Sequence, residues 1–489
     1  MVLISRYRHY LRRAWCVCLA VLLAGCGGAP LQPWHKEHLD EEFRVGRTDD
    51  VQNFADYQAL EARLFRQLDE QVYSEVDTGP AQRLVRYSKG SAADPQVRKP
   101  NWNRSFELVV EQPVGGVLLL HGMSDSPYSL RALGESLHER GYWVIGLRLP
   151  GHGTAPSGLL RMRWQDMAAA VEIAMMHLGE RTGSAPLHIV GYSNGAPLAL
   201  NFALDALEGK TAPVPASLVL ISPAIGLATG AGLASWRRNL ANIPGLGRWA
   251  WLNVQPEFDP WKYNSFPTNA GAQVFALTRA VTRRIAARAR TNPERVLPPT
   301  LVFKSTVDAT VSTRAVADNL LRRAGPERHE LVLFDINRVA GASSVLIDDP
   351  GPLTRRLMDD PKLPFTITLV VNRDPETPQV VAQRKPPFST DIAATTELGQ
   401  AWPREILSLS HVALPFPADD PLYGRGPPPD DGSLFLGQQA IQGERGLIRV
   451  PPDWLLRLRH NPFYPYLEAR ALTWIGNGGP APPGQSAAR

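Results

Sequence analysis

Short apolar runs alternate with amphipathic stretches between about residues 105 and 222. An apolar run bounded by turn residues predicts a strand, whereas apolar residues that recur every three or four positions predict a helix. The predicted strands are Phe106–Val110, Gly116–Leu120, Trp143–Leu147, Leu187–Val190 and Leu218–Ile221, and the predicted helices are Tyr128–Glu139, Trp164–Leu178 and Pro197–Leu207. Apolar strands that alternate with helices are typical of a parallel sheet covered on both faces, so we predict the α/β fold class.

The alternating pattern is interrupted twice and is preceded by a helical stretch. Residues 223–298 carry no strand signal, contain four tryptophans and predict one amphipathic helix near 272–290. The pattern resumes at Leu301–Phe303, and a second interruption at about 337–404 contains a strand-like run, Phe365–Val371. Apolar residues at helical spacing between Val51 and Val76 predict a further helix packed on the main body.

These changes of pattern predict the organisation of the chain. We expect a signal segment at 1–25, a linker and helical extension at 26–104, and the first part of an α/β core at 105–222. A cap at 223–298 and the second part of the core at 299–475 follow, the latter with the insertion at about 337–404. The Gly-, Pro- and Ala-rich tail at 476–489 is typical of disorder.

The first 26 residues resemble a bacterial lipoprotein signal. Four arginines precede an apolar stretch, Ala14–Gly25, which is shorter than the roughly 20 residues of a membrane span. The stretch ends in Leu23-Ala24-Gly25-Cys26, which is similar to the lipoprotein processing box. This resemblance implies that Cys26 becomes the acylated N-terminus, and Gly27 after it resembles the pattern sent to the outer membrane. The alternative is an ordinary signal peptide with an incidental cysteine.

Charge and cysteine content exclude several other classes of function. The formal net charge is +5, but it falls to +1 once the four arginines of the signal segment are removed. The sequence contains no basic tract with interleaved aromatic residues, which is the pattern that would indicate nucleic acid binding. All three cysteines lie in the first 26 residues, so the mature chain predicts neither a disulfide framework nor a thiolate metal site. The sequence indicates no metal or other cofactor.

The strongest chemical signal is Gly191-Tyr192-Ser193-Asn194-Gly195, between a predicted strand and a predicted helix. This context is the one that a nucleophile elbow requires, because a sharp strand-to-helix turn exposes the serine hydroxyl. A second apolar strand ends in His121-Gly122-Met123. Acyl transfer needs two backbone N–H donors for the developing oxyanion, and we expect them from Met123 and Asn194. The alternative is that the second motif is a plain strand-to-helix turn.

Together with Arg148-Leu149-Pro150-Gly151-His152-Gly153, these motifs resemble the monoglyceride lipase and serine aminopeptidase-like branch of the α/β-hydrolases. The resemblance implies an α/β-hydrolase fold with a cap insertion and a Ser-His-Asp triad. Its acid position, after the strand near 300–305, falls on Asp308, and Asp335 is the rival. His121 and His152 are expected to be structural.

The base is expected last in the chain order, which favours His411. The pattern of Ile406–Ser410 predicts the end of a strand, and His411 follows it on a Pro-rich loop. The other candidates fit less well, because His329 starts a predicted strand and His460 precedes Asn-Pro. The separation between Asp308 and His411 is far longer than one helix and one strand require. Residues 337–404 therefore either form an insertion before the last strand or add strands to the sheet.

The predicted function is hydrolysis of carboxylic esters, such as short acyl esters, monoglycerides or lysolipids, at a membrane reached through the lipid anchor. An apolar cap over a triad fits an uncharged acyl ester. A peptidase, amidase or acyltransferase with the same triad and a non-catalytic envelope binding protein are the alternatives. The basic face of the helix near 272–290 is either solvated or a surface for anionic lipid headgroups.

Overall fold

The computed structural model describes residues 30–48, 50–226, 247–308, 310–325, 329–340, 349–403, 406–426, 434–437 and 458–477. The predictions that concern the signal segment, Cys26 and most of the C-terminal tail fall outside the described residues.

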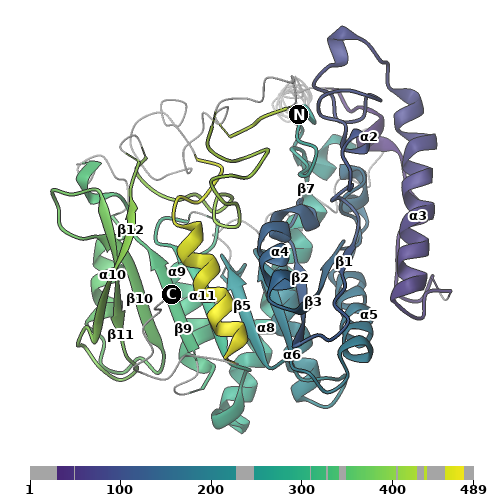
Figure 1. Ribbon diagram of the computed structural model, residues 1–489. Coiled ribbons are helices and arrows are strands. Elements are labelled where there is room, and N and C mark those ends of the chain that lie inside the picture. The colour runs from purple at the N-terminus through teal and green to yellow at the C-terminus, as the bar shows by residue number, and fades with distance from the viewer. Residues whose placement is uncertain are drawn as a thin grey trace, which may run out of the picture.

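One mixed sheet forms the body of the molecule (Figure 1), in the order β1-β3-β2-β4-β5-β8-β9-β10-β11-β12. Its strands are β1 (Phe106–Leu108), β2 (Gly115–Leu120), β3 (Tyr142–Leu147), β4 (Leu187–Tyr192), β5 (Ser217–Ile221), β8 (Thr300–Ser305), β9 (His329–Phe334), β10 (Thr366–Asn372), β11 (Gln379–Lys385) and β12 (Ala394–Ala401). The pairs from β3 through β10 are parallel, whereas β1 and the β10–β11–β12 pairs are antiparallel. This is the predicted α/β class.

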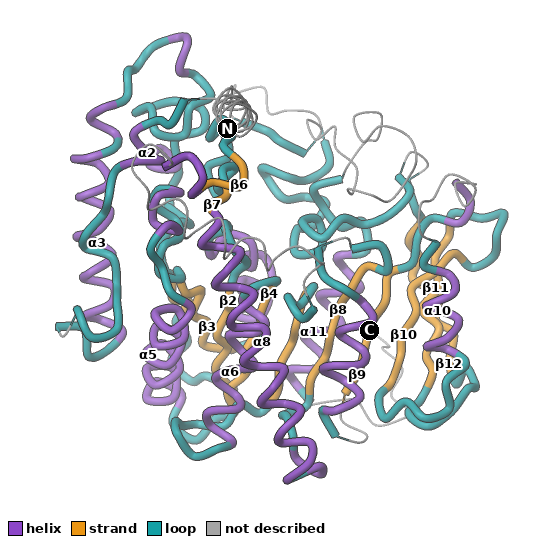
Figure 2. The backbone as a smooth tube through the Cα atoms, turned by 180° about the vertical axis from the view of Figure 1, so that it is seen from behind, coloured by secondary structure: helices purple, strands orange, loops and turns teal. Residues whose placement is uncertain are grey.

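Helices cover both faces of the sheet (Figures 1 and 2). The helices α5 (Trp164–Thr182), α6 (Gly195–Leu207), α8 (Thr268–Thr291) and α10 (Gly351–Met358) contribute to one core with β2, β4, β5 and β8. The helices α4 (Arg131–Glu139) and α11 (Tyr464–Gly476) contribute to a second core on the opposite face. Every residue of β2, β4, β5, β8 and β9 is buried, as expected for strands covered on both sides.

The N-terminal extension is joined to the core by a buried ion pair network. Its helix α3 (Phe54–Gln71) follows the short α2 (Pro33–Lys36) and lies outside α5. The fully buried Arg148 guanidinium lies 2.9 Å from Glu42 Oε1 and 3.1 Å from Glu61 Oε1, and the Tyr57 hydroxyl donates to the Arg148 carbonyl. A buried charge is tolerated when it is paired and hydrogen-bonded, so this extension is part of the folded body.

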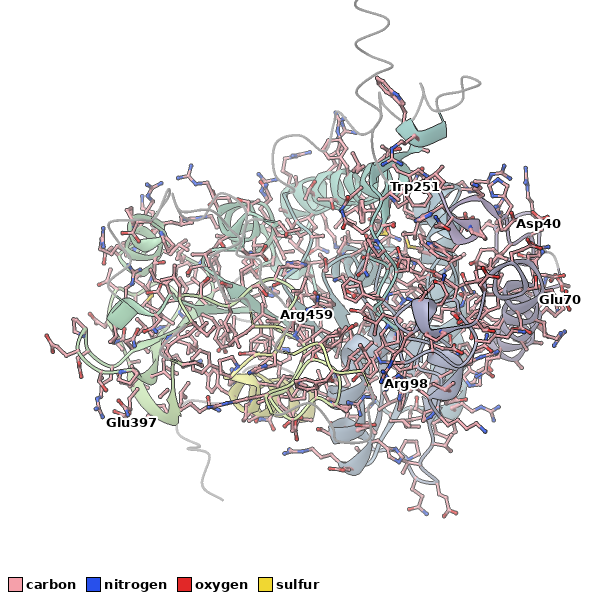
Figure 3. The ribbon with its side chains drawn as sticks, turned by 90° about the horizontal axis from the view of Figure 1, so that it is seen from above. Asp40, Glu70, Arg98, Trp251, Glu397 and Arg459 are labelled. Atoms are coloured by element: carbon pink, nitrogen blue, oxygen red, sulfur yellow. The ribbon has the colours of Figure 1, made fainter. Side chains whose placement is uncertain are left out.

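The interruption at 337–404 adds strands to the sheet, which is one of the two alternatives left open by the sequence. After β9 the chain forms α10 and then β10, β11 and β12, which extend the sheet at the end opposite α3 (Figure 1). Seen from above, Asp40 and Glu70 of the extension lie at one end of the molecule and Glu397 of β12 lies at the other (Figure 3). The long separation of acid and base, 103 positions along the chain, therefore contains an enlargement of the sheet.

The stretch at 223–298 differs from its prediction in two respects. It does contain strands, because β6 (Trp251–Asn253) and β7 (Phe266–Pro267) form a small antiparallel pair. The predicted helix is present as α8, with Val274, Leu277, Val281 and Ile285 buried. These four residues belong to the same core as α6, so α8 is a layer helix of the sheet. Before α8, the structure describes residues 223–226 and 247–267 of this stretch.

Candidate active site

Ser193 occupies the sharp turn between β4 and α6. Its backbone has φ of +50°, a region that L residues other than glycine seldom adopt. A Cβ on Gly191 would lie 2.7 Å from the Ala196 backbone, and one on Gly195 would collide with the Leu120 carbonyl. Both glycines are therefore required by close backbone approach. The strained serine at the N-terminus of a helix has the geometry of a nucleophile elbow.

The loop after β2 packs directly against this elbow. A Cβ on Gly122 would lie 3.2 Å from Ser193 Cβ and 2.8 Å from the Asp125 Oδ2 atom. Met123 follows Gly122 on this loop, and Asn194 precedes the first residue of α6, where backbone N–H groups lack intrahelical acceptors. The two predicted oxyanion donors thus lie on the two segments that meet at Ser193.

The structure brings Ser193, His411 and Asp308 together, although they are far apart in the sequence. The distance from His411 Nε2 to Ser193 Oγ is 3.0 Å, and the distance from His411 Nδ1 to Asp308 Oδ2 is 2.8 Å. All three therefore lie within hydrogen-bond distance in the order that nucleophilic catalysis requires. In this arrangement a neutral imidazole can accept the serine proton while the carboxylate fixes the ring and stabilises its charged form.

Asp308 is held as a carboxylate by its surroundings. Its Oδ1 accepts hydrogen bonds from the backbone N–H groups of Thr310 and Val311, at 2.9 and 3.0 Å. Its Oδ2 lies 2.7 Å from Lys304 Nζ in addition to His411. Burial by itself would raise the pKa of Asp308, but the neighbouring His411 and Lys304 lower it well below its usual value. These neighbours therefore favour the ionised form of the acid.

His411 is positioned by a loop and not by a strand end. The prediction that Ile406–Ser410 ends a strand is wrong, because these residues are irregular. Asn337, just after β9, replaces strand pairing: its N–H donates to the Leu407 carbonyl and its side-chain amide to the Ile406 carbonyl. On the other side the Tyr192 hydroxyl donates to the His411 carbonyl. The base is thus held from β9 and β4 at once.

Two buried carboxylates connect the base loop, residues 406–426 around His411, to its neighbours. Asp420 accepts hydrogen bonds from the Tyr128 hydroxyl, at 2.9 and 3.1 Å, and Tyr128 lies in the segment that leads from the Met123 loop into α4. Asp259 accepts a hydrogen bond of 2.6 Å from the Tyr423 hydroxyl and lies 3.3 Å from Arg459 NH1. Arg459 lies near the middle of the molecule seen from above (Figure 3). These contacts therefore connect the base loop to the segment after the Met123 loop and to the stretch before α8.

The other candidate acid and the other histidines have separate partners. Asp335 is bound by Arg338, with Nε 3.0 Å from Oδ2 and NH2 3.1 Å from Oδ1. His121 and His152 are fully buried, and burial lowers the pKa of His152 to about 4. His121 Nε2 accepts a hydrogen bond from the Leu149 N–H, which connects the loop after β2 to the loop after β3. His329 contacts the Ala324 carbonyl.

Two charged groups near the site were not predicted. Asp125 is buried beside Gly122 and pairs with Lys262 at 3.3 Å, and burial raises the pKa of Asp125. Lys304 is completely buried beside Asp308. A lysine inside the apolar run Thr300–Ser305, four residues before an aspartate, was the available signal for Lys304. No comparable pattern in the sequence linked Asp125 to Lys262.

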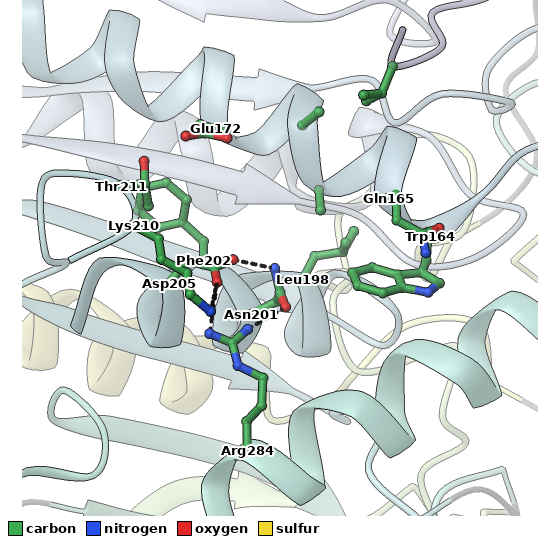
Figure 4. A pocket seen from close by; sticks show the side chains of 13 residues that line it. Trp164, Gln165, Glu172, Leu198, Asn201, Phe202, Asp205, Lys210, Thr211 and Arg284 are labelled. Carbon is green, nitrogen blue, oxygen red and sulfur yellow. Dashed lines mark hydrogen bonds and ion pairs between the residues drawn. The ribbon is translucent and has the colours of Figure 1, made fainter. Parts of the chain in front are cut away.

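A surface cavity of about 510 Å³ lies elsewhere, between α5, α6 and α8 (Figure 4). Trp164, Leu198 and Phe202 form its apolar part, and Arg284 crosses one side to pair with Asp205 at 2.8 Å. Ser193, His411 and Asp308 do not line it. This cavity is therefore separate from the three groups that meet at Ser193.

The described residues contain neither a group of metal ligands nor a helix suited to crossing a bilayer. In that part of the chain, no three or more His, Cys, Asp or Glu side chains are grouped so as to hold a metal ion. None of the helices in the same ranges combines the length and the apolar character that a bilayer crossing needs.

Part of the chain is similar to known hydrolases. The protein-family model described as serine aminopeptidase, S33, matches residues 111–337. A thermostable monoacylglycerol lipase of Bacillus sp. (strain H-257) is 28% identical over 197 residues, which cover 40% of this chain and 71% of that protein. The structure of a Paleococcus ferrophilus monoacylglycerol lipase is 19% identical with a TM-score of 0.37, and covers 47% of this chain and 88% of its own. A monoglyceride lipase from Saccharomyces cerevisiae is 16% identical with a TM-score of 0.35, over 47% and 81% of the two chains.

The matched region 111–337 spans the Met123 loop, the Ser193 elbow and Asp308, whereas His411 and β10 to β12 lie beyond it. The sheet order, the serine elbow and the family match together assign this chain the α/β-hydrolase fold and make it an enzyme of the α/β-hydrolase superfamily.

Proposed function

We propose that the chain is a serine hydrolase that cleaves carboxylic esters through an acyl-enzyme. The proposed substrates are short acyl esters, monoglycerides or lysolipids. The observation that carries this proposal is the continuous hydrogen-bonded path from Ser193 Oγ through His411 to Asp308. The similarity to a monoacylglycerol lipase supports an ester of glycerol as the substrate class.

In the proposed mechanism, His411 Nε2 takes the proton of Ser193 as Oγ attacks the ester carbonyl carbon. The backbone N–H groups of Met123 and Asn194 stabilise the oxyanion, and His411 then gives its proton to the departing alcohol. Water, deprotonated by the same imidazole, attacks the acyl-enzyme and releases the carboxylic acid. Asp308 stays ionised throughout and stabilises the imidazolium.

The test is labelling by a fluorophosphonate probe and hydrolysis of nitrophenyl esters. We expect stoichiometric labelling of Ser193 in the folded protein. Ser193→Ala and His411→Ala should each lower ester hydrolysis by at least about 10³-fold with the fold retained. Near wild-type activity of His411→Ala would place the base elsewhere, and no serine labelling of folded protein would favour a binding function.

The family description favours a second candidate, an aminopeptidase or amidase with the same triad. Both reactions pass through an acyl-enzyme, so the geometry of Ser193 and His411 serves either. A panel of aminoacyl nitroanilides and nitrophenyl esters separates them. If kcat/KM for the amides exceeds that for the esters, the ester proposal is wrong and the triad assignment stands.

We also propose that Cys26 is acylated and holds the enzyme at the bacterial outer membrane. The support is the sequence Leu23-Ala24-Gly25-Cys26 and the near-neutral mature chain. Each buried CH₂ contributes about 0.8 kcal/mol, so two or more acyl chains give stable attachment. Labelling with a fatty-acid analogue should be lost in Cys26→Ser. An unlabelled, freely soluble wild-type protein would contradict the anchor and leave the hydrolase proposal intact.

A further inference from the structure

A buried lysine touches the triad from the side opposite the serine. Lys304 is the fifth residue of β8, and neither its side chain nor that of Asp308 is exposed to solvent. Lys304 Nζ lies 2.7 Å from the same Oδ2 atom that lies 2.8 Å from His411 Nδ1. An ammonium group buried without a counter-charge is strongly disfavoured, so Lys304 and Asp308 form one paired unit.

This lysine changes the charge that surrounds the base. Without Lys304, the net charge of Asp308 and His411 together is −1 while the imidazole is neutral and becomes zero when the imidazole is protonated. With Lys304, the net charge of the three residues is zero before His411 takes a proton and +1 afterwards. A cation within two contacts of the imidazole therefore opposes its protonation, and such an effect is strong where water is excluded.

Other groups around His411 do not cancel this effect. From the loop after β2, the Asp125 carboxyl faces His411, but Asp125 is paired with Lys262. From β4, the uncharged Tyr192 ring lies 5.6 Å from the imidazole, centroid to centroid. These neighbours are unchanged by substitutions at Lys304, so a comparison of variants isolates the lysine.

We propose that Lys304 is a positioning residue that sets the pH range in which His411 is the neutral base and extends this range toward acid. The proposal rests on the proposed hydrolase function. Lys304 acts through Asp308: it fixes Oδ2 while the backbone of Thr310 and Val311 fixes Oδ1, so the carboxylate has one orientation toward the imidazole.

The test compares the pH dependence of kcat/KM for a nitrophenyl ester in Lys304→Met and Lys304→Gln. Methionine keeps most of the volume without charge, and glutamine keeps a hydrogen-bond donor without charge. In both variants the midpoint of the acid limb should rise by about 1 to 2 pH units.

Lys385 supplies a matched control. It is also completely buried, and its Nζ donates to the Leu357 carbonyl at 2.9 Å and to the Asp360 carbonyl at 2.7 Å, beyond β9 and away from the triad. Lys385→Met should lower stability in a similar way but leave the acid limb unchanged. This control separates loss of a buried cation in general from loss of the cation beside Asp308.

Acid limbs that coincide in the Lys304 variants and the wild-type enzyme would overturn the role of Lys304 alone. If neither variant folds, Lys304→Arg decides: it keeps a cation beside Asp308 and should keep the wild-type acid limb, so a displaced limb in that variant overturns the proposal. Absence of both serine labelling and ester hydrolysis in the wild-type enzyme would instead overturn the proposed function, and this inference with it.

Discussion

Asp308 and Asp335 follow neighbouring parallel strands, and both are buried at the same edge of the sheet. Asp335 comes directly after β9, and its N–H still bonds to the Val370 carbonyl of β10, so its carboxylate turns to Arg338 three residues on. Asp308 comes three residues beyond the end of β8, past a turn, and its carboxylate reaches His411. The distance from the strand end, and not the residue type, decides which acid reaches the base.

The largest expected difference between the two acids is catalytic. Asp308→Asn should lower ester hydrolysis by at least about 10³-fold, because the amide cannot stabilise the imidazolium, whereas Asp335→Asn should stay within about tenfold. The double variant Lys304→Met/Asp308→Asn removes both buried charges and should remain inactive while folded, as measured by circular dichroism. An inactive Asp335→Asn beside an active Asp308→Asn would exchange their roles.

A third buried acid shows what happens without a contacting cation. Glu257 accepts the N–H groups of Ser265 and Asn264, at 2.8 and 2.9 Å, and burial raises its pKa from 4.5 to about 7. The folded protein therefore binds the proton more tightly than the unfolded chain. Glu257 favours folding below about pH 4.5, and this contribution is lost as the pH rises through 7.

Glu257→Gln should remove that dependence. The fall in unfolding free energy between pH 5 and pH 8 should become smaller by about 2 to 3 kcal/mol relative to the wild-type protein. Urea unfolding at a series of pH values is the measurement, with constant ionic strength. Parallel pH curves for the two proteins would mean that burial does not govern this carboxyl group.

Asp335 is expected to matter for stability more than for catalysis. Its partner Arg338 is 25% exposed, so solvent weakens the pair. Asp335→Asn should lower the unfolding free energy by about 1 to 2 kcal/mol. Arg338→Met should have an effect of similar size. A loss above about 4 kcal/mol in either variant would show that this loop is as tightly organised as the Asp308 loop.

The smallest expected effect concerns the support of the base loop. Tyr128→Phe removes the hydroxyl that contacts both carboxylate oxygens of Asp420 but leaves the N–H groups of Leu422 and Tyr423 and the nearby Arg131. The variant should lose about 1 kcal/mol of stability. We expect kcat to fall only a few-fold, measured with a saturating ester. A loss comparable to that of His411→Ala would make this tether essential for placing the base.

The sequence predicted the central part of this molecule well because burial on both faces leaves a clear pattern. The strands β2 to β5 and β8 lie within two residues of their predicted bounds, and the elbow, acid and base meet. The strand β12 could not be predicted, since most of Ala394–Ala401 is exposed and its pairing with β11 comes from the backbone.

Two further differences have physical reasons. Ile406 and Leu409 are buried and lie in a short run of mainly apolar residues, yet they pack as an irregular segment held by Asn337. The helix α11 was not predicted, although Leu467, Ala471 and Ile475 recur at helical spacing and cover the sheet opposite α8. Periodicity alone does not show which neighbour a segment will find.

The path of the chain also has a kinetic consequence. Ser193 and His411 are separated by 218 residues, and the strands β8 to β12 must be in place before the base loop has a surface to rest on. Contacts between distant parts of a chain form late, because closing a long loop costs entropy before it gains stabilising contacts. During refolding, secondary structure should therefore return first, and reactivity of Ser193 toward a fluorophosphonate should appear only when the last segments have docked.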